Sequence, residues 1–354
     1  MGADDTMGPH HPNKTAILMM VDGMNYLRTD AVWMSFLNQA SYAWRSQRPH
    51  FLWVGLVNQT ALNQRQLSVF GASCASKANY NTMHYYKPIA IMTLFRKQTM
   101  VDSVQTALFL DADAAFSDVA FESSIGPENY FEISQQASLF GWQNGKGGNI
   151  MNSAILLLRN TPWMYDFSSL WWYSRCGYKD QRGLWLVLFA TWSAATDIGD
   201  QELARFAYPS VVFGNYGYCN KIVLSILKTR LQSIHTSWTS HPLAESATNP
   251  FQVPRPKTLE RHNGGNTFAG SGKAITPIEL PHVVIMPLSK FIHKRVDGTE
   301  LELPGFKIDV RTRGAPMVIH SKNYRGACLK NKCWPFVLSD DVGTRNADVL
   351  AAAE

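Results

Sequence analysis

Two aspartates, Asp111 and Asp113, stand one residue apart at the end of an apolar run, in the stretch "ALFLDADAAF". A lone buried carboxylate costs several kcal/mol unless a partner charge, hydrogen bonds or a metal ion compensates it. Hard divalent cations such as Mg²⁺ and Mn²⁺ prefer carboxylate oxygens, and they bind one or two carboxylates together with substrate phosphates. Two aspartates on one side of a sharp bend therefore predict a metal site that neutralises charge on a departing phosphorylated group.

Short apolar runs and helical patterns must position this pair. Continuous apolar runs are typical of buried parallel strands, and helical patterns separate them here. The predicted strands of the first third lie at 15–21, 49–57 and 107–113, and the predicted helices at 29–46 and 85–96. Strands that alternate with helices indicate an α/β fold with a parallel sheet, whose ligands gather at the carboxyl ends of the strands. Asp22, which follows the first strand, falls at the same edge as the aspartate pair.

The rest of the chain continues this pattern with one long interruption. Further strands are predicted at 137–142, 153–160, 282–287 and 316–321, and further helices at 162–176 and 180–192. Residues 239–281 are rich in Pro, Gly, Asn and Ser, and we expect them to form a long flexible loop. Residues 1–14 are expected to be a disordered leader and 339–354 a frayed tail, with a single domain over 15–338 between them.

Composition and charge exclude several classes of protein. The 354 residues are 45% hydrophobic and 17% charged, which excludes wholesale disorder. The net charge of +6 lies mainly in the C-terminal part, without a basic block of the kind that binds nucleic acid, so no nucleic-acid partner is expected. A phosphorylated ligand, an acidic polymer and a merely solvated basic surface all stay open from charge alone. The longest apolar run, "LWLVLFATW", is too short to cross a bilayer, and no membrane segment is expected.

The stretch "LFLDADAAF" resembles the D-x-D segment of GT-A glycosyltransferases, which bind a nucleotide-sugar through Mn²⁺. Other stretches follow in the order found in glycosyltransferase family 34, the galactosyl- and xylosyltransferases: "NQASYAWRSQRPHFLWVG", "HYYKPIAIMTLF", "GGNIMNSAILLLRNTPW", "KDQRGLWLVL" and "PMVIHS". The likeness covers roughly residues 15–326. It implies an α/β chain with the GT-A nucleotide-diphospho-sugar transferase fold, in which helices flank a Rossmann-like, mostly parallel central sheet. Residues 15–338 would form a single GT-A catalytic domain.

The resemblance implies a Mn²⁺ or Mg²⁺ site and a UDP-sugar site. Asp111, Asp113 and His320 would hold the metal ion. Val21, Asp22 and Gly23 would contact the uracil and ribose, and Asp111 and Ala112 would bind the donor from the D-x-D turn. Asn152 and Ser153 would line the sugar pocket, and Lys87 would reach the donor. The diphosphate would be bound by Lys322, Arg325 or Lys330. The structural alternatives are a core histidine at 320, a turn or capping residue at 22 and a surface ion pair for the lysine at 87.

The resemblance also implies a retaining transfer. Asp180 and Gln181 would lie on the face of the sugar opposite the leaving group and stabilise an oxocarbenium-like transition state. Front-face attack, in which the leaving phosphate takes the acceptor proton, needs only positioning and electrostatics. A helix N-cap is the structural alternative for Asp180. Ala154 stands where the family often has Gly, which narrows the expected sugar pocket.

The expected function is therefore metal-dependent transfer of a hexose or pentose from a UDP-sugar to a hydroxyl of a glycan acceptor. One alternative is a metal-dependent PIN-like ribonuclease, because "ILMMVDGMNYLR" is similar to the opening strand of that class and would supply Asp22. Another is a non-catalytic protein that binds nucleotide-sugars or glycans on a GT-A fold. Relatives of the transferase kind work in the Golgi lumen behind an anchor, so the chain is expected to be a trimmed Golgi domain or a soluble intracellular outlier. The sugar, acceptor and oligomeric state stay open.

Overall fold

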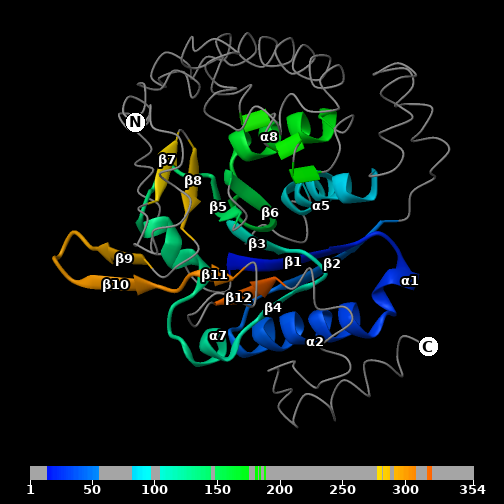
Figure 1. Ribbon diagram of the computed structural model, residues 1–354, viewed down its shortest axis with the longest axis horizontal. Helices are drawn as coiled ribbons and strands as arrows, with labels where there is room; N and C mark the ends of the chain where they lie inside the picture. The colour runs from blue at the N-terminus through cyan, green and yellow to red at the C-terminus, as the bar shows by residue number, and fades with distance from the viewer. Residues whose placement is uncertain are drawn as a thin grey trace, which may run out of the picture.

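The computed structural model describes residues 14–55, 82–96, 104–144, 148–174, 180–181, 183–184, 187–188, 277–280, 282–287, 291–307 and 317–320. They form a seven-stranded sheet with helices on both faces, a three-stranded sheet and a two-stranded hairpin (Figure 1). Within these ranges, no helix combines the length and the apolar character that crossing a membrane requires. The expected tail, and the expected leader apart from Lys14, lie outside the described residues.

The elements alternate between strands and helices through the first half of the chain. In order, they are β1 (Thr15–Val21), α1 (Met24–Leu27), α2 (Asp30–Arg45), β2 (His50–Val54), a 3₁₀ turn (Thr82–Tyr85), α5 (Tyr86–Arg96), β3 (Thr106–Leu110), β4 (Ala114–Phe116), α7 (Asp118–Glu122) and a second 3₁₀ turn (Pro127–Glu132). The remaining ones are β5 (Leu139–Asn144), β6 (Gly148–Arg159), α8 (Pro162–Tyr173), β7 (Ile278–Leu280), β8 (Val283–Met286), β9 (Phe291–Lys294), β10 (Glu300–Leu303), β11 (Phe306–Lys307) and β12 (Val318–His320).

The large sheet has the strand order β2-β1-β3-β6-β5-β8-β7. β1 pairs in parallel with β2 and β3, and β5 pairs in parallel with β8. β6 runs antiparallel to both of its neighbours, and β7 runs antiparallel to β8. All strands except β6 and β7 therefore share one direction, which confirms the predicted α/β architecture with a mostly parallel central sheet.

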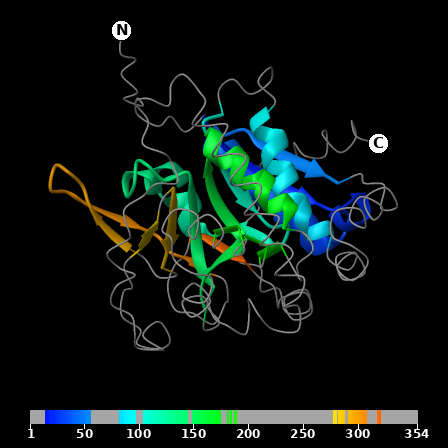
Figure 2. The same cartoon turned by 90° about the horizontal axis from the view of Figure 1, so that it is seen from above.

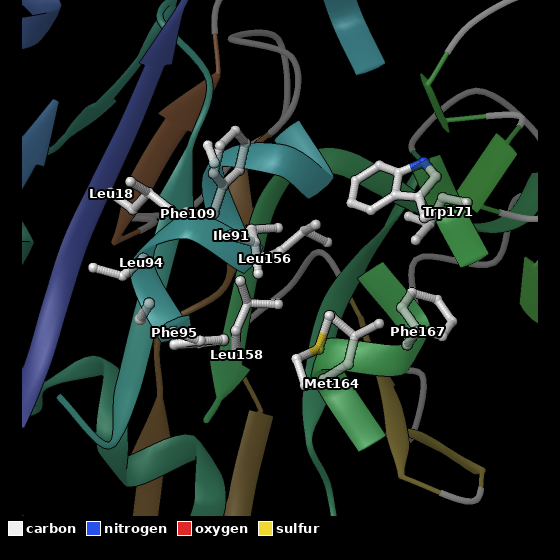
Figure 3. Close-up of a cluster of buried hydrophobic side chains, with 14 of the residues drawn as sticks. Leu18, Ile91, Leu94, Phe95, Phe109, Leu156, Leu158, Met164, Phe167 and Trp171 are labelled. Atoms are coloured by element: carbon white, nitrogen blue, oxygen red, sulfur yellow. The ribbon is translucent and has the colours of Figure 1, made fainter. Parts of the chain in front are cut away.

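The apolar runs of the sequence are buried because helices cover both faces of this sheet. Successive side chains of a strand point to opposite faces. Leu18 of β1 packs on one face in a cluster with Ile91 of α5 and Trp171 of α8, part of which Figure 3 shows. Its neighbour Ile17 packs on the other face in a cluster with Tyr42 of α2. A strand with no exposed face has no alternation of polar and apolar residues, which is the pattern that predicted it.

Backbone hydrogen bonds fix the point at which α2 ends. The Arg48 amide donates a hydrogen bond to the Ala43 carbonyl (2.8 Å) and the Gln47 amide donates one to the Trp44 carbonyl (3.1 Å). These are the two bonds of a Schellman turn, and Gln47 adopts the left-handed φ of 53° that this turn requires. Pro49 follows and prevents the helix from continuing. The chain therefore leaves α2 at a fixed point and enters β2.

Three features differ from the sequence expectations. The last residues of the expected 239–281 loop form the edge strand β7, because Ile278 and Leu280 pair with the buried strand β8. The short strands β4, β11 and β12 form a separate sheet in the order β11-β12-β4. The hairpin of β9 and β10 was not predicted, and it projects from the rest of the described chain in both views (Figures 1 and 2). The elements that were predicted by range lie where the sequence places them, within about five residues, whereas α1, α7 and β11 had no predicted range.

Candidate functional site

The turn that carries Asp111 and Asp113 lies between two sheets. It connects β3 of the large sheet to β4 of the three-stranded sheet. The Asp111 amide donates a hydrogen bond to the Ala154 carbonyl (2.8 Å), and the Ala114 amide donates one to the Asp111 carbonyl (2.9 Å). Backbone hydrogen bonds therefore fix the turn on both sides. The two carboxylates lie at the carboxyl end of β3, as the sequence predicts.

The pairing of β12 with β4 brings His320 beside this turn. The two strands are antiparallel, and His320 lies opposite Ala114. The Nε2 atom of His320 lies 3.0 Å from Asp113 Oδ1 and 3.8 Å from Asp111 Oδ2, and the side chain is fully buried. The structure thus brings together the three residues that the resemblance implied as metal ligands, although the histidine lies far along the chain.

These three side chains fit a small divalent cation. One ligand atom from each residue lies within 4.8 Å of the other two. Ligand atoms bound at about 2.1 Å to one octahedral ion lie about 3.0 Å apart when adjacent and about 4.2 Å apart when opposite, so the two imidazole–carboxylate distances suit such an ion. Although Nε2 lies 3.0 Å from Asp113 Oδ1, neither ring nitrogen of His320 makes a hydrogen bond of suitable geometry among the described residues, and buried polar atoms normally make one. An ion between the carboxylates would give Nε2 its partner.

Lys87, the second residue of α5, bridges the aspartate turn to Asp180. Its Nζ atom lies 2.7 Å from Asp111 Oδ1 and 2.6 Å from Asp180 Oδ2, and its side chain is 3% exposed. Burial lowers the pKa of Lys87, but the carboxylates of Asp111 and Asp180 outweigh burial and raise that pKa above its ordinary value. Burial raises the pKa of Asp180, but Lys87, His84 and Ser153 together outweigh burial and keep that pKa below its ordinary value. Lys87 does form ion pairs, but they are buried, so the alternative of an ion pair at the surface is wrong.

A bulge in β6 turns Ser153 toward Asp180. Residues 153–155 pair with no residue of β5, because the register of the two strands shifts at this point. Bulges of this kind re-aim side chains. The Ser153 hydroxyl donates a hydrogen bond to Asp180 Oδ2 (2.7 Å). The side-chain oxygen of Asn152 instead accepts a hydrogen bond from the Ala154 amide (2.7 Å), so it is engaged within its own strand.

The segment that begins with Asp180 is helical at each of its described positions. The Trp171 indole of α8 donates a hydrogen bond to the Asp180 carbonyl (2.8 Å), which ties the segment to the neighbouring helix. Gly183 permits the close approach, since a Cβ atom there would lie 2.7 Å from the hydroxyl of Tyr85. Gln181 follows Asp180 and is partly exposed. The segment therefore holds Asp180 at a fixed place beside Lys87.

Three polar residues of α2 hold the aspartate turn and were not identified from the sequence. Ser35 and Gln39 both donate hydrogen bonds to the Ala114 carbonyl, the bond from Gln39 at 2.9 Å. Asn38 accepts from the Phe116 amide (2.7 Å) and donates to the Phe116 carbonyl (3.1 Å). Their spacing was the available signal, because residues three and four apart lie on one helix face. Buried polar side chains on such a face need specific partners.

The end of β1 lies next to the aspartate turn. Val21 and Ala112 belong to one buried apolar cluster, so their side chains serve packing. Asp22 and Gly23 follow and are partly exposed. Burial, and then the negative charge of Asp22, raise the pKa of Tyr86 to about 12, which places Asp22 near the start of α5. The residues predicted to contact the uracil and ribose thus lie at the same edge of the sheet as Asp111, Asp113 and His320.

The basic residues predicted to bind the diphosphate, Lys322, Arg325 and Lys330, lie outside the described residues, and their roles stay predictions. The described site itself carries the carboxylates of Asp111, Asp113 and Asp180 and the single ammonium group of Lys87. The net charge of these groups is negative, so a diphosphate needs a cation in order to bind at this edge of the sheet.

Comparisons with known proteins give little further information. No protein-family model matches the chain, and no curated protein matches its sequence. Among solved structures, the chain is similar to a glycosyltransferase involved in the glycosylation of the major capsid of PBCV-1, with 10% sequence identity and a TM-score of 0.34. The alignment covers 46% of this chain and 66% of that chain, slightly less than two thirds of its length. A likeness this slight does not assign the chain to a family.

Proposed function

We propose that this chain is a metal-dependent glycosyltransferase of the GT-A type, related to glycosyltransferase family 34. It would move a hexose or pentose from a UDP-sugar to a hydroxyl of a glycan acceptor, with retention of the anomeric configuration. The observation that carries the proposal is the cluster of Asp111, Asp113 and His320 at the carboxyl edge of a mostly parallel sheet. Ligands of such sheets bind at this edge, and the cluster offers the oxygen-rich donor set that Mn²⁺ and Mg²⁺ take.

The roles of the chain's residues follow from this placement. Asp111, Asp113 and His320 would hold Mn²⁺ or Mg²⁺, which supplies positive charge against the diphosphate and the departing UDP. The backbone at 21–23 and at Ala112 would border the uracil and ribose. Lys322 and Arg325 are proposed for the diphosphate, where lysine acts as a point charge and arginine as a two-pronged donor.

The sugar would lie between the metal site and the Asp180 segment. Gln181 is proposed to face the sugar, and the charge of Asp180 is proposed to stabilise the positive charge that develops on the ring in the transition state. Ser153 and Lys87 hold the Asp180 carboxylate. Retention is proposed through front-face attack, in which the leaving phosphate takes the acceptor proton, because this route needs oriented groups but no nucleophile.

The group formed by Asp111, Asp113 and His320 also bears on the ribonuclease alternative. That alternative requires Asp22 to join later acidic residues around one ion. Within the described ranges, the group that brings metal-binding atoms together consists of Asp111, Asp113 and His320, without Asp22. A non-catalytic binding protein would share the whole arrangement and differ only in turnover.

A panel of UDP-sugars tests the proposal directly. Thermal unfolding of the full chain is measured with each UDP-sugar, with and without Mn²⁺, and released UDP is quantified. We expect one UDP-sugar to raise the melting temperature only when Mn²⁺ is present and to be hydrolysed slowly. The D111N/D113N variant, which keeps similar side-chain volumes, should lose both effects. Metal-dependent cleavage of RNA, or no stabilisation by any UDP-sugar, would overturn the proposal, and stabilisation without turnover would point to the binding protein.

A further inference from the structure

Lys87 occupies a buried position between two carboxylates that have different surroundings. Its Nζ atom lies 2.7 Å from Asp111 Oδ1 and 2.6 Å from Asp180 Oδ2, and it also donates to the carbonyl (3.3 Å) and the hydroxyl (3.4 Å) of Ser153. The lysine therefore divides its charge between the aspartate turn and Asp180. A change in the charge of one carboxylate therefore alters how strongly Lys87 interacts with the other, because the ammonium group is buried and poorly screened by solvent.

The two carboxylates use their oxygens differently. Asp180 has a side chain that is 6% exposed, and its Oδ2 also accepts a hydrogen bond from Ser153. Asp111 is 18% exposed; Lys87 engages its Oδ1, while its Oδ2 faces the imidazole of His320. One oxygen of Asp111 is thus held by the lysine, and the other is turned toward the metal position.

From this arrangement we infer that Asp180 sets the affinity of the metal site without binding the ion. Asp180 attracts the ammonium group of Lys87 and thereby weakens the interaction of that group with Asp111. This inference rests on the metal site of the proposed function. An ammonium group on Asp111 competes with a cation for the same carboxylate, and Asp180 reduces that competition. Lys87 thus acts on the site through Asp111: it occupies Oδ1 and leaves Oδ2 to face the ion.

The charges of the site give the sign of the effect. Asp111, Asp113 and Asp180 with Lys87 carry a net charge that balances one divalent cation. Neutralising Asp180 leaves the lysine to act on Asp111 alone, which disfavours the cation. Removing the lysine as well restores the balance, so the effect of Asp180 should disappear once Lys87 is absent.

A double-mutant cycle measures this coupling. Mn²⁺ binding to the full chain is measured by calorimetry without nucleotide, for wild type, D180N, K87M and K87M/D180N. We expect D180N to weaken Mn²⁺ binding about tenfold, because the lysine charge then acts on Asp111 alone and opposes the cation by about 1.4 kcal/mol. K87M should bind Mn²⁺ no more weakly than wild type, and D180N in the K87M background should change the affinity by less than about threefold.

A matched control separates this coupling from general loss of stability. Arg48 and Glu128 form a buried ion pair away from the metal site, with two nitrogen–oxygen contacts of 2.7 and 2.8 Å. E128Q should lower the melting temperature and leave Mn²⁺ affinity unchanged. Equal weakening of Mn²⁺ binding in D180N and K87M/D180N, or none in D180N, would overturn the inference.

The outcomes also distinguish this inference from the proposed function. If no UDP-sugar is turned over but the four Mn²⁺ affinities follow the expected order, the inference stands and the transferase proposal fails. If turnover is found but D180N binds Mn²⁺ like wild type, the transferase stands and the inference fails. Should D180N not fold, K87M decides the matter, because Mn²⁺ binding more than about tenfold weaker than wild type would show that the lysine supports the site rather than competing at it.

Discussion

His320 supplies the only nitrogen among the three grouped metal-binding atoms of the described chain, and it is the ligand most remote in sequence. H320Q keeps a polar side chain of similar length but removes the imidazole nitrogen. We expect Mn²⁺ affinity to fall by about tenfold or more, because a lost ligand costs at least as much as a lost partner of a ligand. Calorimetric titration checks this. H293Q, on the projecting hairpin, is the control and should bind Mn²⁺ as wild type does; equal affinity of H320Q and wild type would contradict the metal site.

A different histidine predicts how stability depends on pH. Burial lowers the pKa of His50 to about 4, and its Nε2 atom has no hydrogen-bond partner within the described part of the chain. The unfolded chain binds a proton near pH 6.5, whereas the folded chain does so only near pH 4, so the contribution of His50 is complete above pH 6.5 and is lost as the pH falls toward 4. Because His50 is only partly buried, we expect it to account for about 2 kcal/mol of the unfolding free energy that is lost as the pH falls.

Urea unfolding at pH 7.5 and pH 4.5 measures this share. H50F preserves the ring contact with Phe36, whose centroid lies 5.3 Å away, and removes the titrating group. The loss of unfolding free energy between the two pH values should be smaller in H50F than in wild type by that amount. An equal loss in both proteins would show that other groups control the acid sensitivity.

At the scale of elements, the polar face of α2 predicts which helix contacts hold the site. N38A removes both hydrogen bonds with the Phe116 backbone and leaves a buried amide and carbonyl of β4 without their side-chain partner. We expect a loss of about 2–3 kcal/mol in unfolding free energy. Weaker Mn²⁺ binding should accompany it, since β4 follows directly on Asp113. W44A on the same helix is the control, because Trp44 is 73% exposed, and it should change neither quantity appreciably.

The elements also show where sequence patterns suffice. β1 and β3 were predicted because continuous apolar runs of this length indicate strands with two buried faces. The β9–β10 hairpin was missed although "VDGT" offered a turn signal, for Gly298 takes a φ of 82° and the Thr299 amide donates a hydrogen bond to Asp297 Oδ1 (2.9 Å). The pairing of Lys87 with Asp180 was not predictable, because no local pattern reports contacts between distant helices. His320 was found through the resemblance, since a three-residue strand carries almost no pattern.

At the scale of the whole molecule, the proposed metal ion joins two sheets. Asp111 directly follows β3 of the large sheet, whereas Asp113 precedes β4 and His320 ends β12, both strands of the three-stranded sheet. An ion that binds the folded chain alone stabilises it by about 2.7 kcal/mol at a concentration one hundred times its dissociation constant. We therefore expect Mn²⁺ to raise the melting temperature and EDTA to reverse this.

Hydrogen exchange locates this effect within the molecule. Amides of β4 and β12 should exchange more slowly with Mn²⁺, while those at the centre of β1 and β3, far inside the large sheet, should change little. D111N/D113N is the control and should respond to neither Mn²⁺ nor EDTA. A uniform change over all strands, or none, would speak against an ion that links the two sheets.

The short antiparallel pairing of β4 with β12 makes the histidine sensitive to chain length. Because alternate residues of a strand face opposite ways, moving β12 by a single position along β4 would point the imidazole away from the two aspartates. A one-residue insertion or deletion just before Val318 is therefore expected to abolish cation binding, even where every residue of the cluster is still present.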